Sequence, residues 1–302
     1  GAVVQNGELV LGTDSQAVRF IATQGVDTAA VATATAVVDG TSISRLIRKI
    51  GPGTLVLDNF TCNKLDGSDN KTGNNWNLAF TVGKGNNSVF DGAIRETGNG
   101  ASNSTLFSNS PLTLVGGVLE LDGVDCTRGL DNHTGGIDAA WSGGMGFAAH
   151  GGNRIVNLFG NATPSRLDWG GSNRLFVAAA SDTPLIFGST TADSTVDFRN
   201  PFNLNVGTGS LDRYIRLVRG VGTVPEAEMT GGLVNTGAGT ANLIVSGYTG
   251  LGAPAAGTLV LSNSGNNTYN GTTTVQNGAT LLVNGILSSN PAMVTVAATA
   301  TL

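Results

Sequence analysis

The feature that most constrains this fold is a short unit, an apolar strand-like run between glycine and asparagine turns, which recurs along the chain. One copy reads NNTYNGTTTVQNGATLLVNG (266–285), with three Asn-Gly pairs around the runs TTTV and ATLLV. Such pairs between strand-like runs ordinarily predict a β-hairpin. QNG also stands at 5–7, however, and GTLVL stands at both 53–57 and 257–261. This recurrence favours a corner between successive sheets, with TTTV and ATLLV in different sheets.

One such unit is not stable alone. Ordering its backbone costs roughly 1–2 kcal/mol per residue. In return it buries two or three aliphatic side chains, each worth about 1.5–3 kcal/mol. Stacked units let every strand bond to the strands before and after it and share one apolar interior, so we expect a stack of short strands.

The composition agrees with strands and limits the partners. The 302 residues include 45 Gly, and 40% are hydrophobic but only 12% charged, which suits neither a disordered chain nor a helical bundle. The net charge of −5 argues against nucleic acid, whose phosphates require clustered Lys and Arg. No apolar run is long enough for a transmembrane segment.

Two segments fit more than one secondary structure. In SISRLIRKIG (42–51), four aliphatic residues have helical spacing and Ser42 could cap a helix. We nevertheless expect a strand, because this segment leads into the GTLVL unit at 53–57. The Ala/Val/Thr-rich run 27–40 fits either structure.

Residues 61–110 are rich in Asn, Gly and Ser, and we expect a polar, loop-rich insertion there. The chain has two cysteines, Cys62 and Cys126, which fit either one disulfide or two buried thiols. A disulfide closing so long a loop would stabilise the fold by about 4 kcal/mol in the chain-entropy model.

The segment 257–285 resembles the autotransporter-associated β-strand repeat, also called the passenger-associated transport repeat. The matching positions are Gly257, Thr258, Leu259, Leu261, Asn267, Tyr269, Gly271, Thr273, Val275, Gly278, Leu281, Val283, Asn284 and Gly285. Upstream segments such as FAAHGGNRIVNLFG (147–160) resemble the sequence that precedes this repeat in large bacterial surface proteins. The resemblance implies an all-β fold, a right-handed parallel β-helix (β-solenoid) with inserted loops, forming a single elongated unit over residues 1–302.

The same resemblance implies an extracellular or cell-surface location and a structural or adhesive role as the stalk of a bacterial passenger protein. The end VTVAATATL and the start GAVVQNGELVLG, read in succession, give strand, glycine turn and strand. We therefore expect either a longer β-helix or self-association end to end into a filament. A further hypothesis is a carbohydrate-binding surface that uses Trp76, Trp141 or Trp169. We expect these residues instead to pack in the core or under loops.

The alternative function is a polysaccharide-degrading enzyme, a glycosidase or lyase. The densest polar segment, LDGVDCTRGLDNHTGGID (121–138), contains Asp122, Asp125, Arg128, Asp131, His133 and Asp138. A glycosidase requires two carboxyl groups at a defined separation, and Asp122, Asp125 and Asp131 are the candidates. The spacing of these carboxylates matches no catalytic motif. A second histidine, His150, belongs to the segment 147–160 that resembles the sequence preceding the repeat. We therefore predict no enzyme and assign no catalytic or cofactor-binding residue.

Metal motifs are weak. Two Cys and two His provide no zinc site of familiar spacing. Asp66, Ser68 and Asn70 alternate as in a Ca²⁺ loop, but Lys71 stands where glycine is required and no Glu follows at the twelfth position. We assign no metal ligands, and Ca²⁺ is the only cofactor that the sequence suggests.

Overall fold

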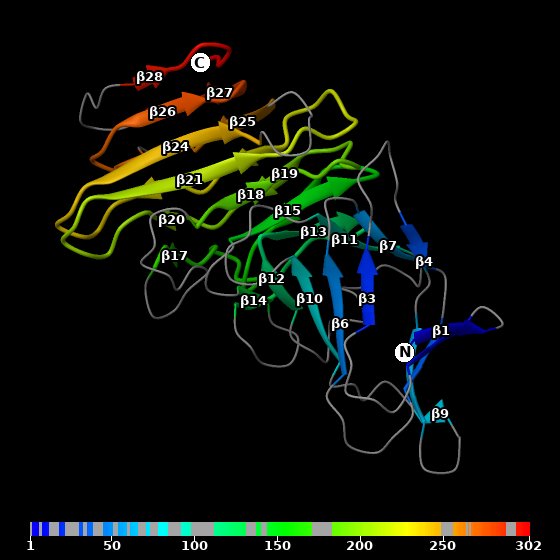
Figure 1. Cartoon of the computed structure of the whole chain (residues 1–302). Helices are drawn as coiled ribbons and strands as arrows, with labels where there is room; N and C mark the ends of the chain where they lie inside the picture. The colour runs from blue at the N-terminus through cyan, green and yellow to red at the C-terminus, as the bar shows by residue number, and fades with distance from the viewer. Residues whose placement is uncertain are drawn as a thin grey trace.

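The computed structural model describes the strands along the chain, together with residues 92–97, 112–130, 137–139, 144–170, 183–248, 256–263, 265, 267–287 and 294–302. Within these residues the chain forms strands and turns and no helix (Figure 1). Side chains are described chiefly in three parallel sheets, which carry the sites considered below.

The largest sheet has ten strands and runs from the N-terminal part of the chain to its C-terminal end (Figure 1). In spatial order its strands are β4 (Ala30–Ala32), β7 (Thr54–Asp58), β11 (Ala93–Thr97), β13 (Gly117–Asp122), β15 (Met145–His150), β18 (Leu185–Phe187), β21 (Leu211–Leu217), β24 (Ala241–Gly247), β26 (Thr273–Gln276) and β28 (Val294–Val296). Neighbouring strands are parallel throughout, and the register of β21 on β24 places Leu211 beside Ala241.

Two smaller parallel sheets accompany the later part of the large one. The five-stranded sheet contains β16 (Arg154–Val156), β19 (Val196–Phe198), β22 (Ala227–Met229), β25 (Gly257–Leu261) and β27 (Ala279–Val283). The three-stranded sheet contains β17 (Leu167–Asp168), β20 (Phe202–Asn203) and β23 (Leu233–Val234).

Two further sheets lie toward the N-terminal end. One is parallel and contains β3 (Val18–Ile21), β6 (Arg45–Ile50), β10 (Leu78–Gly83), β12 (Leu112–Val115) and β14 (Ile137–Ala139). The other contains β1 (Ala2–Gln5), β2 (Glu8–Leu11), β5 (Thr35–Val38), β8 (Thr61–Leu65) and β9 (Lys71–Thr72), and its two outermost pairs, β1–β2 and β8–β9, are antiparallel.

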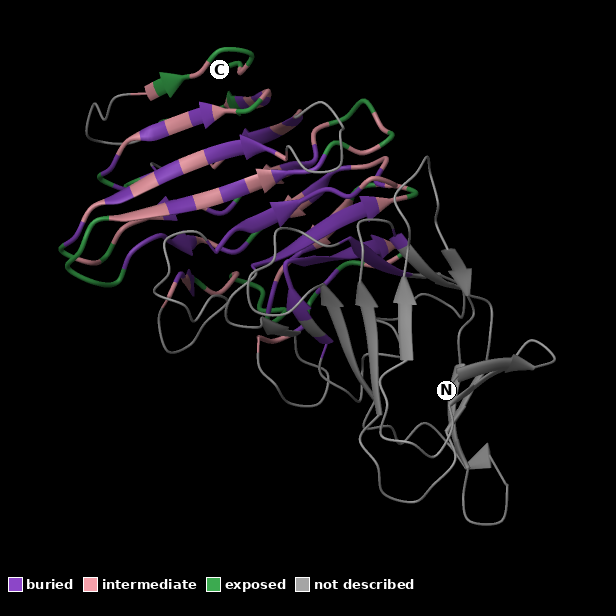
Figure 2. Ribbon diagram, in the orientation of Figure 1, coloured by how far each residue is buried: buried purple, intermediate pink, exposed green. Residues whose placement is uncertain are grey.

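The core lies between the sheets and follows from the two-residue period of the strands. In β21, Arg213, Ile215 and Leu217 are buried, while the residues between them are only partly buried. Figure 2 shows this alternation as bands along the strands, with buried residues concentrated in the middle of the described part. Four phenylalanines, Phe147, Phe187, Phe198 and Phe202, are fully buried there, and the rings of Phe187 and Phe198 meet edge to face with centroids 5.7 Å apart.

The prediction of a right-handed parallel β-helix (β-solenoid) with inserted loops is wrong. The described strands form separate, mainly parallel sheets of unequal extent that do not close into one coil. The five-stranded sheet accompanies only part of the ten-stranded one, and the strands of the smallest sheet are two residues long. Strands so short contribute only a few ladder hydrogen bonds.

The two QNG segments have different structures. TTTV and ATLLV belong to β26 and β27, which lie in different sheets, so the predicted corner at Asn277-Gly278 is confirmed. At the first copy, β1 and β2 pair antiparallel with Gln5 beside Glu8, and extending the corner interpretation to this copy was wrong. The first strand, β1, is therefore not a parallel strand of the kind that the expected junction between the last strand and the first requires.

The strand predicted within 42–51 is confirmed as β6, and the ambiguous run 27–40 contains the strands β4 and β5. Of the expected insertion at 61–110, the structure describes the strands β8 to β11, while its intervening turns lie outside the described residues. The insertion and the single-unit organisation of residues 1–302 therefore stay predictions.

Candidate functional site

Three polar side chains form a row where strands of the large sheet end. Asp122 and His150 close β13 and β15 and are directly paired in the parallel register, and Asp193 follows β18. The Nδ1 atom of His150 lies 3.4 Å from Asp122 Oδ2, and its Nε2 atom lies 3.7 Å from Asp193 Oδ2. We call these three residues the Asp–His–Asp row.

Asp193 is held by backbone as well as by charge. Its Oδ1 atom accepts hydrogen bonds from Gly151 N at 2.8 Å and from Ser194 Oγ at 2.7 Å. Partial desolvation opposes ionisation, but the bonds from Ser194 and Gly151 and the nearby His150 outweigh it and lower the pKa of Asp193. The segment that follows β18 is thereby fixed to the end of β15.

The chemistry available to this row is electrostatic attraction between the imidazole and the two carboxylates. The contacts of 3.4 and 3.7 Å are long for hydrogen bonds, and the buried Nδ1 atom of His150 has no hydrogen-bond partner among the described residues. The Ser194 hydroxyl donates to Asp193 rather than to His150, so the arrangement is not that of a nucleophile and its base. The imidazole also lies between the two carboxylates, where a glycosidase needs room for a sugar and a water.

A second polar cluster lies on the outer face of the large sheet and is buried. Arg95 of β11 and Glu120 of β13 are register partners, with Arg95 Nη1 at 2.9 Å from Glu120 Oε1. Thr191 Oγ1 donates to Glu120 Oε2 at 2.7 Å, and the Ser189 hydroxyl donates to the same oxygen. Only 8% of Arg95 and 1% of Glu120 is exposed, so this is a desolvated ion pair. Glu120 accepts hydroxyl hydrogen bonds, whereas Nε and Nη1 of Arg95 have no hydrogen-bond partner within the described part of the chain.

The segment that covers this ion pair also covers apolar side chains. Ala192 and Val218 pack over outward-facing residues of β11, β13, β15 and β18 in a second hydrophobic cluster (Ala93, Val118, Ala148, Ile186). Thr191 also shares a 2.7 Å hydrogen bond with Thr54 of β7, which is 137 residues away in sequence. Both polar sites therefore fasten residues 188–194 across several strands of the large sheet.

A buried arginine lies at another edge of the core. Arg213 Nε donates to Leu204 O at 2.7 Å and its Nη2 to Trp169 O at 3.1 Å, while the guanidinium carbon lies 5.5 Å from the centre of the Trp169 ring. Burial lowers the pKa of Arg213 to about 10. Trp169 is itself 1% exposed and packs on Phe202, so the core role expected for it is confirmed and a carbohydrate-binding role is wrong.

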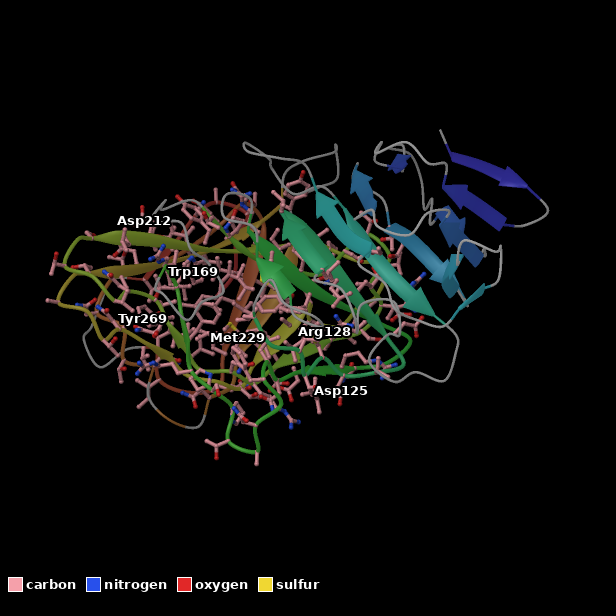
Figure 3. All side chains as sticks on the ribbon, turned by 90° about the horizontal axis from the view of Figure 1, so that it is seen from below. Asp125, Arg128, Trp169, Asp212, Met229 and Tyr269 are labelled. Atoms are coloured by element: carbon pink, nitrogen blue, oxygen red, sulfur yellow. The ribbon has the colours of Figure 1, made fainter. Side chains whose placement is uncertain are left out.

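The structure separates the remaining predicted residues. Asp125 is exposed, and its Oδ1 accepts a bond from Ile155 N at 2.8 Å, whereas Arg128 is buried. Figure 3 places Asp125 near the margin of the molecule and Trp169 within its body. Asp122 thus joins the Asp–His–Asp row, whereas Asp125 holds a turn. The side chains of Asp131, His133, Asp138, Trp76, Trp141, Asp66, Ser68 and Asn70 lie outside the described residues.

Cys126 is a free thiol within the described part of the chain, so the disulfide with Cys62 is not formed. Burial raises the pKa of the Cys126 thiol, which favours the unreactive protonated form. No group of three or more metal-binding side chains occurs among the described residues.

The sequence reasoning missed Glu120, Arg95 and Asp193. The parallel register that pairs Asp122 with His150 was not deducible from their spacing, and the contacts of residues 188–194 join segments far apart in sequence. The sequence offered a signal only for a different residue, Phe159. It precedes Gly160 in a turn where this chain elsewhere places Asn before Gly.

No protein-family model, curated protein or solved structure matches this chain. Within the described residues, no helical segment has the length and apolar character that crossing a membrane requires.

Proposed function

We propose that this chain belongs to an extracellular or cell-surface structural or adhesive protein of a bacterium, and that its copies associate end to end into a filament. The proposal joins two observations. Residues 257–285 resemble the autotransporter-associated repeat of surface passengers, and the ten-stranded sheet ends in β28, which among the described residues is paired on one side only.

The observation that carries the proposal is the edge at β28. Within the described residues this strand pairs only with β26, through a register that places Val296 beside Val275. Ala297 N donates to Val275 O at 2.8 Å, and in a parallel ladder the N–H and C=O of Val296 then point away from β26. An edge of this kind is a template for a strand of another chain.

Exposed apolar side chains gather near this edge. Of the eight large hydrophobic residues that are exposed among those described, four lie within residues 282–302: Leu282, Ile286, Val296 and Leu302. Their exposed fractions range from 40% to 54%. An apolar surface beside an unpaired strand favours association with a second copy.

The test is an edge-blocking substitution. Val296→Pro removes one outward N–H and leaves the bonds of Ala297 and Thr295 with β26 in place, whereas Val296→Ala keeps the N–H and removes only methyl groups. Sedimentation velocity over a range of protein concentrations should show assemblies for the wild type and for Val296→Ala, and monomers for Val296→Pro. A wild type that stays monomeric throughout would contradict the proposal.

A polysaccharide-degrading function is not favoured by the carboxylates that the structure describes. Asp122 pairs with His150, and Asp125 accepts a backbone hydrogen bond. Release of reducing ends from a polysaccharide by the purified protein, abolished in Asp125→Asn, would overturn this choice.

A further inference from the structure

Two turns of this chain have positive φ values at a non-glycine residue and the glycine that follows it, but the non-glycine residue differs. Asn277 and Gly278 have φ values of 53° and 70°, and Phe159 and Gly160 have φ values of 73° and 63°. Glycine and asparagine tolerate this left-handed region, whereas for other L-residues it costs roughly 1–2 kcal/mol. Phe159 therefore occupies a position where steric preference favours asparagine.

The surrounding structure holds Phe159 in this conformation. Its N–H donates to Arg128 O at 3.0 Å in the neighbouring segment. The preceding residue, Leu158, is held on both sides of its peptide by the buried Asn200, with Leu158 N to Asn200 Oδ1 at 2.7 Å and Asn200 Nδ2 to Leu158 O at 3.1 Å. Strain that is held this firmly is a frequent mark of a functional position.

Phe159 is one of three non-glycine residues with positive φ among those described, and it is also the exposed aromatic of the described chain. The Phe159 side chain is 43% exposed, while Phe147, Phe187, Phe198, Phe202 and Trp169 are at most 1% exposed. A Cβ built on Gly129 would lie 3.6 Å from the Phe159 ring, so one side of the ring lies close to that backbone. The ring is thus presented to solvent and contributes little to the core.

Neutral hydrogen-bonding groups follow Phe159 in the same segment. Two residues along the same turn, the exposed Asn161 donates from Nδ2 to Ser165 Oγ at 2.8 Å, which fixes its amide. Thr163 is exposed in the same segment. Of the cations near Phe159, Arg166 is paired with Asp168 at 3.3 Å, and Arg128, whose carbonyl accepts the Phe159 N–H, is buried. A flat apolar ring beside amides and hydroxyls matches the apolar face and hydroxyl rim of a neutral sugar better than it matches an anion.

We propose that residues 157–165 bind a sugar ring of a neutral polysaccharide, with Phe159 stacking on the sugar and Asn161 hydrogen-bonding to its hydroxyl groups. This inference rests on the proposed adhesive function and gives it a ligand class and a contact residue. Loss of the aromatic face should weaken binding by at least about tenfold, as expected for one dominant anchor.

The experiment is native gel electrophoresis through gels containing dextran, galactomannan, hydroxyethylcellulose or xylan. The variants are Phe159→Asn, which restores the Asn-Gly pair of the matched turn, and Phe159→Tyr, which keeps the ring. Val206→Asn is the control, because Val206 is 45% exposed in a different turn. We expect at least one polysaccharide to retard the wild type, Phe159→Tyr and Val206→Asn, and to retard Phe159→Asn far less.

The inference is overturned if none of the four polysaccharides retards the wild type, or if Phe159→Asn is retarded equally. It is also overturned if Phe159→Asn loses self-association in sedimentation velocity, since the ring would then contact a second copy. Failure of polysaccharide binding with assembly intact would remove the ligand site and leave the proposed structural function standing.

Discussion

The substitution Glu120→Gln should strongly destabilise the protein, because it removes the negative charge from a buried ion pair and leaves Arg95 in place. Glu120 is 1% exposed and lies 2.9 Å from Arg95, and it also accepts the hydroxyls of Ser189 and Thr191. Removing one partner of a buried pair costs about 3–5 kcal/mol. Since domains are stable by only about 5–15 kcal/mol, this loss should be easily measured.

The assay is urea unfolding followed by far-ultraviolet circular dichroism. The matched control is Glu228→Gln, the same change at a partly buried residue of β22, which should change the free energy of unfolding by no more than about 0.5 kcal/mol. The double variant Arg95→Met/Glu120→Leu replaces both charges and should recover most of the loss. A loss below about 1 kcal/mol for Glu120→Gln, or one equal to that of Glu228→Gln, would refute the reasoning.

Three further predictions use other buried or hydrogen-bonded groups. Burial raises the pKa of Tyr269 to about 12. The part of the phenolate absorbance that is present in the wild type and absent in Tyr269→Phe should therefore appear near pH 12. Its appearance near pH 10 would count against this burial. Because its pKa is lowered on folding, Asp193 stabilises the protein above about pH 4 and loses this effect as the pH falls. Urea unfolding should therefore show Asp193→Asn less stable than wild type at pH 6 by under about 1 kcal/mol, with the difference vanishing at acid pH, because this side chain is 37% exposed and screened. Asn267 accepts Leu233 N at 2.9 Å while 1% exposed, so Asn267→Ala should cost about 1–3 kcal/mol in urea unfolding, and an unchanged midpoint would mean that the bond is dispensable.

The short strands and their turns were predictable from the sequence because they depend on local preferences. GTLVL at 257–261 forms β25, and the corner at Asn277-Gly278 has the positive φ values that this pair favours. The two QNG segments show the limit of this reasoning. The same three residues join an antiparallel pair at one place and two different sheets at the other, so the surrounding pairing decides the outcome.

The failure of the sheets to close into one coil was not predictable, because closure depends on how many residues of each repeat unit lie in strands. Stretches such as Leu167–Asp168 and Leu233–Val234 are two residues long, too short to form an extended wall.

The polar sites depend on register and on distant segments. His150 faces Asp122 because β13 and β15 pair in one particular register, and a slip of β15 by one residue would turn His150 to the other face of the sheet. Glu120 and Thr191 are 71 residues apart, and no local pattern relates them. Asp122 was identified among the polar residues of its segment, but its partner lay beyond that segment.

The central claim is that copies of this chain assemble as a structural element, and negative-stain electron microscopy of the purified protein tests it most directly. The account predicts long filaments of uniform width for the wild type and discrete particles for Val296→Pro. Discrete particles for the wild type at every concentration examined would contradict it.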